Sequence, residues 1–205
     1  MKKLELVYRH LLYGAMEKKN RELTISSLAK TLSLSLSTVH LALKPLVRMN
    51  AISMKLRGFT VIDLKKILYY WASVRNIEKD IVYATRVEEP VTEIEKQMPD
   101  DVVFTAFSGY KFKFKDVPAD YSEVYVYGGE SVQKRWKKEM AGGNRSSGGT
   151  KNNPNVFVLQ KDELVGSYGK TATIAQLFVD LWNLRQWYAK DFLTALEVHV
   201  GRILE

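Results

Sequence analysis

The chain has 205 residues, of which 46% are hydrophobic and 26% are charged; this composition excludes wholesale disorder, and the length favours two domains because one core usually serves about 100 to 150 residues. It contains no cysteine, which excludes disulfide frameworks and thiolate chemistry, and it has no apolar run near the roughly 20 residues of a membrane span. The net charge of +8 is unevenly distributed, because residues 1–76 contain 14 Lys and Arg against 4 Asp and Glu, a net charge of +10, and the remainder sums to −2. Such segregation is typical of a nucleic-acid-binding segment joined to a segment with another purpose.

Helical periodicity dominates the first fifty residues. Apolar residues recur at helical spacing over about 3–18, which predicts a first helix. A short extended piece at 23–25 precedes a second helix, which Ser26 can cap, and Ser35 or Ser37 can cap a third. Three short helices are therefore expected before residue 50.

A hairpin pattern follows the third helix. The stretches 51–55 and 59–62 alternate with period two around Arg57-Gly58, which indicates two antiparallel strands and a tight turn. Helix, helix, helix and hairpin is the order of a winged helix, and we predict a winged-helix domain over residues 1–63. The runs 23–32 and 35–39, with the leucines spaced after them, resemble the helix-turn-helix of many bacterial and archaeal winged-helix regulators.

The third helix has two different sides. Its predicted buried side is Val39, Leu43, Leu46 and Val47, and its opposite side is Ser37, His40, Leu41 and Lys44. No Asp or Glu occurs between residues 22 and 63, so this region would meet phosphates without repulsion. An ordinary solvent-exposed helix face is the alternative interpretation.

We predict DNA contacts from the third helix and the hairpin. The candidate residues are Ser35, Ser37, Thr38, His40, Leu41, Lys44, Arg48, Lys55 and Arg57. Ser37 and Lys44 would reach base edges or phosphates, and Leu41 could touch a thymine methyl group. Lys55 and Arg57 would grip the backbone or the minor groove. A proline at position 45 predicts a bend in the same helix.

The remaining residues predict a linker helix and a mixed domain. Residues 64–77 place apolar residues on one face, so we expect a linker helix that could also pair with a second copy of the chain. Residues 78–205 are expected to form an α+β domain for partner binding or oligomerisation. Within it, 123–127 and 156–159 are predicted strands, and 174–200 is a long helical region or two helices that meet near 183–186. Thr92 and Glu95 have the spacing of a capping box that would open a short helix after Pro90, and the apolar segment 102–106 could start a strand or a helix.

Three segments of this second domain resemble a known family. They are TAFSGYKF, PADYSEVYVYG and QLFVDLWNLRQWYAKDFLTALE. These segments resemble the C-terminal domain of AbiE-type antitoxins. Such antitoxins pair an N-terminal winged helix with a C-terminal domain that is related in shape to nucleotidyltransferases. The resemblance implies repression of a toxin operon, with a cognate toxin as a protein partner.

Catalytic and metal-binding patterns are weak. A working nucleotidyltransferase needs two carboxylates at i and i+2 on one face of a strand to hold divalent metal. Glu93 and Glu95 have this spacing, as do Glu78 and Asp80, but both pairs fall in segments that read as helical turns. The glycine-rich segment 141–155 lacks the Gly-Lys-Ser/Thr ending of a phosphate-binding loop. We predict no metal, no cofactor and no enzymatic activity.

The sequence thus predicts an α+β protein that is a sequence-specific DNA-binding transcriptional regulator, in its sharpest form an antitoxin-like autorepressor. Its expected partners are double-stranded DNA, a cognate toxin or other protein, and a second copy, with no membrane and a cytoplasmic location. One alternative is a nucleotidyltransferase-like enzyme that uses the winged helix as a nucleic-acid-binding module. Another is a protein scaffold whose basic hairpin binds an acidic partner.

Overall fold

The computed structural model describes residues 1–142 and 153–204, and it is a mixed α+β fold with two small sheets. The chain forms two compact units. Unit 1 comprises residues 1–75, 173–184 and 193–205, and unit 2 comprises residues 76–172 and 185–192. The expected division was a domain at 1–63, a linker helix at 64–77 and a second domain at 78–205. The structure differs because residues 64–75 belong to unit 1 and because two segments near the C-terminus, 173–184 and 193–205, return to unit 1. In the described part of the chain, no helix is long and apolar enough to cross a membrane.

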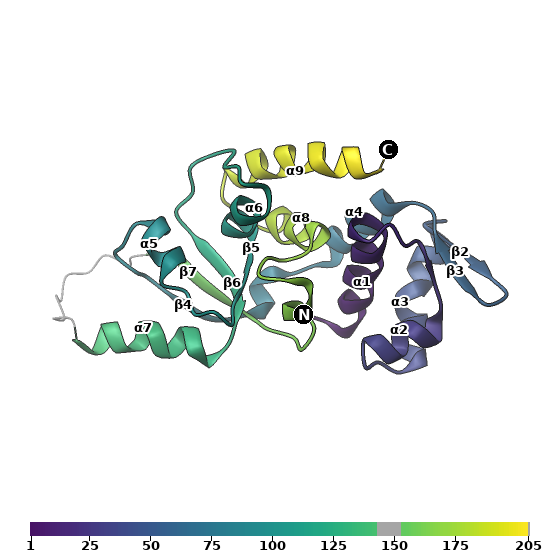
Figure 1. Ribbon diagram of the computed structural model, residues 1–205, viewed down its shortest axis with the longest axis horizontal. Coiled ribbons are helices and arrows are strands. Elements are labelled where there is room, and N and C mark those ends of the chain that lie inside the picture. The colour runs from purple at the N-terminus through teal and green to yellow at the C-terminus, as the bar shows by residue number, and fades with distance from the viewer. Residues whose placement is uncertain (143–152, 205) are drawn as a thin grey trace. The chain divides into compact units, whose positions relative to one another are not determined.

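Unit 1 is built around packed helices (Figure 1). They are α1 (Lys3–Glu17), α2 (Ile25–Thr31), α3 (Leu36–Arg48), α4 (Leu64–Val74), α8 (Ile174–Trp182) and the latter part of α9 (Ala189–Leu204). Helix α1 packs on α3, α4 and α8, and α4 also packs on α8. The apolar face of α4, which the sequence offered as a linker surface, is buried in this core: Ile67, Leu68 and Trp71 are at most 2% exposed.

Buried charges join the start of α1, the end of α4 and α8. The guanidinium of Arg75 donates to Glu5 at 3.1 Å and to Asp180 at 3.2 Å, and the side chains of all three are at most 3% exposed. The indole of Trp71 also donates to Glu5, at 3.1 Å. A buried charge is tolerated only when it is paired, so residues 105 positions apart in sequence depend on each other for burial.

A three-stranded antiparallel sheet completes unit 1. It consists of β1 (Glu22–Leu23), β2 (Ile52–Lys55) and β3 (Gly58–Val61), in the order β1-β3-β2. The predicted hairpin is confirmed, with Leu56 and Arg57 as its two-residue turn. Gly58 has a φ of +143°, and a Cβ there would lie 2.5 Å from the carbonyl oxygen of Leu23. Only glycine lets β1 approach β3 this closely.

Unit 2 contains the second sheet. Its strands are β4 (Ile81–Thr85), β5 (Val103–Thr105), β6 (Val124–Gly128) and β7 (Val156–Gln160), in the order β4-β7-β6-β5. Strands β6 and β7 are parallel, and the two outer pairs are antiparallel. The other elements are η1 (Ile77–Asp80), α5 (Val91–Lys96), α6 (Ala106–Phe114), α7 (Glu130–Gly142), η2 (Val165–Tyr168) and the start of α9.

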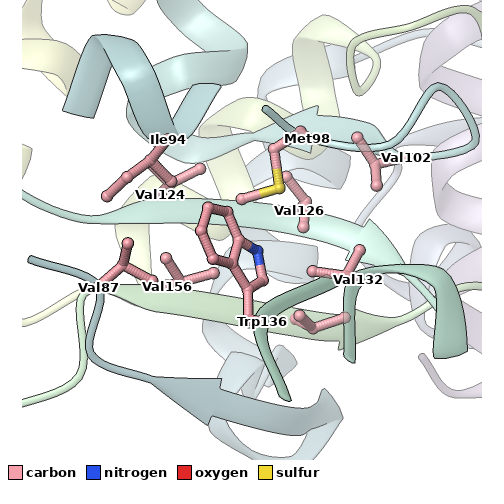
Figure 2. Packing of buried hydrophobic residues seen from close by; sticks show 10 residues of the cluster. Val87, Ile94, Met98, Val102, Val124, Val126, Val132, Trp136 and Val156 are labelled. Atoms are coloured by element: carbon pink, nitrogen blue, oxygen red, sulfur yellow. The ribbon is translucent and has the colours of Figure 1, made fainter. Parts of the chain in front are cut away.

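The central strand β6 is buried on both faces, so its five residues separate two packed layers. Figure 2 shows the first layer, in which Trp136 of α7 lies among Val124 and Val126 of β6 and Ile94 and Met98 from α5 and the loop after it. The second layer is aromatic. In it, the Phe107 ring of α6 packs against Tyr125, Tyr188 and Phe192, with ring centroids 5.0–6.2 Å apart.

Local expectations in unit 2 were partly right. The strands at 123–127 and 156–159 are confirmed within one residue at each end. The region 174–200 forms two helices, α8 and α9, separated by residues 183–188, which confirms the two-helix alternative. The capping box of Thr92 and Glu95 is wrong, because α5 begins at Val91 and its N-cap residue Pro90 makes no side-chain cap. Most of the glycine-rich segment 141–155 lies outside the described residues.

Candidate nucleic-acid interface

Hydroxyl groups organise the beginning of α3. The N-cap residue is Ser35, whose oxygen accepts the backbone N–H of Thr38 at 3.1 Å. The same oxygen lies 2.9 Å from the hydroxyl of Ser37 and 2.8 Å from that of Thr38. Two of the predicted contact residues, Ser35 and Thr38, are therefore engaged in capping the helix, which fixes where α3 starts. Ser37 is exposed beside this cap.

The outer face of α3 carries polar and basic side chains. His40, Leu41, Lys44 and Arg48 are all exposed, as the sequence predicted. Among the described residues, the side chains of His40, Lys44 and Arg48 have no hydrogen-bonding or ionic partner. Three of these positions, Leu41, Lys44 and Arg48, are spaced i, i+3 and i+7 and so form one stripe along the helix. Helix α3 continues through Pro45 to Arg48.

The hairpin presents its two candidate cations differently. Arg57 lies in the turn and is exposed, next to Leu56, which is 99% exposed. Lys55, in contrast, forms a 2.6 Å ion pair with Glu22 of β1. The hydrogen bond and the charge of Lys55 lower the pKa of the Glu22 carboxyl. The sequence between residues 22 and 63 contains no acid, but the folded hairpin does have a carboxylate beside it, because β1 brings Glu22 next to Lys55.

A groove of about 660 Å³ runs between α3 and β2. Its lining residues are Ser37, His40, Leu41, Leu43, Lys44, Val47, Arg48 and Met54. The prediction that Val47 is buried is wrong, since its side chain is 39% exposed, and sequence reasoning missed both Val47 and Met54 as site residues. The buried face of α3 is Val39, Ala42, Leu43 and Leu46. Val47 lies eight residues after Val39, at the edge of this face.

Charge separates the two units, although less sharply than it separates the sequence at residue 76. Unit 1 contains 15 Lys and Arg and 7 Asp and Glu, a net charge of +8, and unit 2 contains 16 of each, a net charge of zero. Two of the seven acids in unit 1, Glu5 and Asp180, are buried against Arg75. Arg9 and Arg75 of the same unit are buried as well, so among the described residues these two buried acids are balanced by two buried bases.

Three of the carboxylates considered for metal binding in unit 2, Glu78, Glu93 and Glu95, have cationic partners. Glu93 pairs with Lys96 at 2.7 Å, and Glu78 pairs with Arg185 at 3.0 Å. Glu95 pairs with Lys111 at 2.6 Å and also accepts the hydroxyl of Tyr121. In the portion of the chain that the structure describes, no group of three or more His, Asp or Glu side chains is placed to hold a metal ion.

No family model, curated protein or solved structure matches the chain.

Proposed function

We propose that the chain is a sequence-specific DNA-binding transcriptional regulator in which unit 1 acts as a winged helix. The observation that carries the proposal is the exposed face of α3, where the side chains of His40, Lys44 and Arg48 have no partner among the described residues. This helix belongs to unit 1, which holds the whole net positive charge of the protein. Basic groups left without intramolecular partners are available to replace the counterions of a phosphate backbone.

In this proposal, α3 and the hairpin have different tasks. In winged-helix and related proteins a recognition helix enters the major groove, and the stripe Leu41, Lys44 and Arg48 is the part of α3 that would face base edges. Arg57, in the exposed turn between β2 and β3, would reach the neighbouring backbone or minor groove. The hairpin extends away from the helices of unit 1 (Figure 1), which leaves its turn accessible.

The regulator is proposed to be an antitoxin-like autorepressor. The support for this narrower form is the resemblance of the segments within residues 78–200 to AbiE-type antitoxins. In this proposal unit 2, which has no net charge, serves a protein partner such as a cognate toxin, or a second copy of the chain.

The test is a binding-site selection with the full chain and a library of random duplexes. We expect one enriched motif, bound at least about 10³-fold more tightly than unrelated duplex. The logarithm of the affinity should fall linearly with the logarithm of salt concentration, with a slope of about −0.9 per neutralised phosphate. Arg57→Ala should make this slope shallower by about one, and Lys44→Ala should relax the preference at particular base pairs.

Lys79→Ala is the matched control, because Lys79 is an exposed lysine of unit 2, and it should change neither property. Binding without sequence preference that vanishes at physiological salt would refute the proposal and favour a scaffold for an acidic protein. An identical motif for the wild type and the Lys44 variant would show that Lys44 does not read the bases.

A further inference from the structure

The groove between α3 and β2 combines a basic rim with an apolar floor. Leu41, Val47 and Met54 are 58%, 39% and 46% exposed, and all three line the same groove. Large apolar side chains are left exposed together at a cost in free energy, so such patches commonly mark a binding surface. A surface that only gripped phosphates would gain nothing from them.

The charge of the surroundings limits what can occupy this groove. Its ionisable lining residues are His40, Lys44 and Arg48, and it contains no carboxylate. An occupant therefore needs negative charge at the rim and small apolar groups at the floor. Duplex DNA offers both in its major groove, which is flanked by phosphates and carries one kind of apolar group, the 5-methyl group of thymine.

The residue types in the groove also restrict which bases it can read. Asn and Gln pair with adenine, and Asp and Glu accept from cytosine, but the groove is lined by none of these four. Lys and Arg pair with guanine, and apolar side chains contact thymine. The lining is thus suited to guanine and thymine.

We propose that this groove reads thymine through its 5-methyl group, with Leu41, Val47 and Met54 as the specificity-determining contacts. The proposal rests on the proposed function, since it requires α3 to enter the major groove. It adds that the recognised site contains thymines whose methyl groups contribute directly to affinity, next to guanines that face Lys44 or Arg48.

Replacing thymine by deoxyuridine in the selected duplex provides the test, because it removes only the methyl group and keeps the base pair and its hydrogen-bonding edge. Each thymine of the site is replaced in turn, and the Kd of the full chain is measured by fluorescence anisotropy. For at least one position we expect a loss of about fourfold, the factor that corresponds to burying one methyl group. Replacements in the flanking sequence should have no effect.

Protein variants then show which side chain reads the methyl group. At least one of the variants Leu41→Ala, Val47→Ala and Met54→Ala should bind the thymine and deoxyuridine duplexes equally well. In a double-mutant cycle, removing the methyl group has no further effect once the side chain that contacts it has been removed. Leu56→Ala is the matched control: Leu56 is a fully exposed apolar residue outside the groove, so this variant should retain the fourfold penalty. Since these side chains are exposed, the variants should keep the thermal unfolding midpoint of the wild type.

Two results would overturn the inference while leaving the proposed function in place. One is specific binding that no deoxyuridine replacement weakens, which would assign the apolar floor to another occupant such as an apolar protein segment. The other is a methyl penalty that persists in all three groove variants. A complete lack of specific DNA binding would instead refute the proposed function itself.

Discussion

The ion pair between Lys55 and Glu22 predicts that removing an acidic residue strengthens the proposed DNA binding. The two side chains are 54% and 71% exposed and their charged atoms lie 2.6 Å apart. An exposed pair of this kind contributes little to stability, so Glu22→Gln should leave the fold intact. It should, however, release Lys55 to neutralise a phosphate.

The size of the effect follows from counterion release. One additional phosphate contact makes the slope of log affinity against log salt steeper by about 0.9. Relative to 1 M salt, this corresponds to a gain in affinity of about 15-fold at 50 mM and about fourfold at 200 mM. Fluorescence anisotropy with the selected duplex across this range of salt would measure both the slope and the gain.

A global change of charge must be separated from the release of Lys55. Glu163→Gln makes the same change in net charge at an exposed carboxylate of unit 2, and it should leave the slope unchanged. If the two variants give equal slopes, the reasoning from the ion pair is refuted. Combining Glu22→Gln with Lys55→Ala should cancel the gain, because the cation that produces it is then absent.

Two further predictions concern the folding of unit 1. Arg75→Met should lower the free energy of unfolding by about 3–5 kcal/mol, because it leaves the buried carboxylates of Glu5 and Asp180 without their shared cation; urea unfolding followed by tryptophan fluorescence would measure it, and a loss under about 1 kcal/mol would contradict it. Burial, with a smaller effect of the Arg9 charge, lowers the pKa of His10 in the folded chain. Below about pH 6.5 the imidazole of the unfolded chain therefore binds a proton more readily than that of the folded chain. The free energy of unfolding should consequently decrease as the pH falls. His10→Gln should weaken this decrease in urea unfolding between pH 7.5 and pH 5, and an unchanged pH dependence would exclude His10 as its source.

Some features that depend on neighbouring residues were predicted correctly, although the cap of α2 is Thr24 and not Ser26. Ser35 caps α3, and the hairpin turns just before Gly58, because caps and tight turns are decided within about four residues. The segment 102–106 had read as either a strand or a helix, and it is both: β5 ends at Thr105, and α6 starts at Ala106, whose φ is +49°.

Features that depend on distant residues were not predictable. Glu22 reaches Lys55 only because β1 pairs with β3. Met54 joins the groove only because β2 lies beside the end of α3. The exposure of Val47 was not predictable either, because Val47 lies at the edge of an amphipathic face. A side chain there is buried or exposed according to which neighbouring element packs against it. Of the candidate site, the polar face of α3 and Leu41 were therefore visible in the sequence, and Val47 and Met54 were not.

The return of α8 to unit 1 has a consequence for synthesis of the protein. Arg75 is made 105 residues before Asp180, which at ordinary ribosomal rates is an interval of about 5–20 s. During this interval the nascent chain contains all of α3 and the hairpin but lacks the helix that completes their supporting core. We therefore expect a growing polypeptide to acquire the proposed DNA affinity only late in translation. A gene fusion that replaces everything after residue 76 should yield an incompletely folded N-terminal segment.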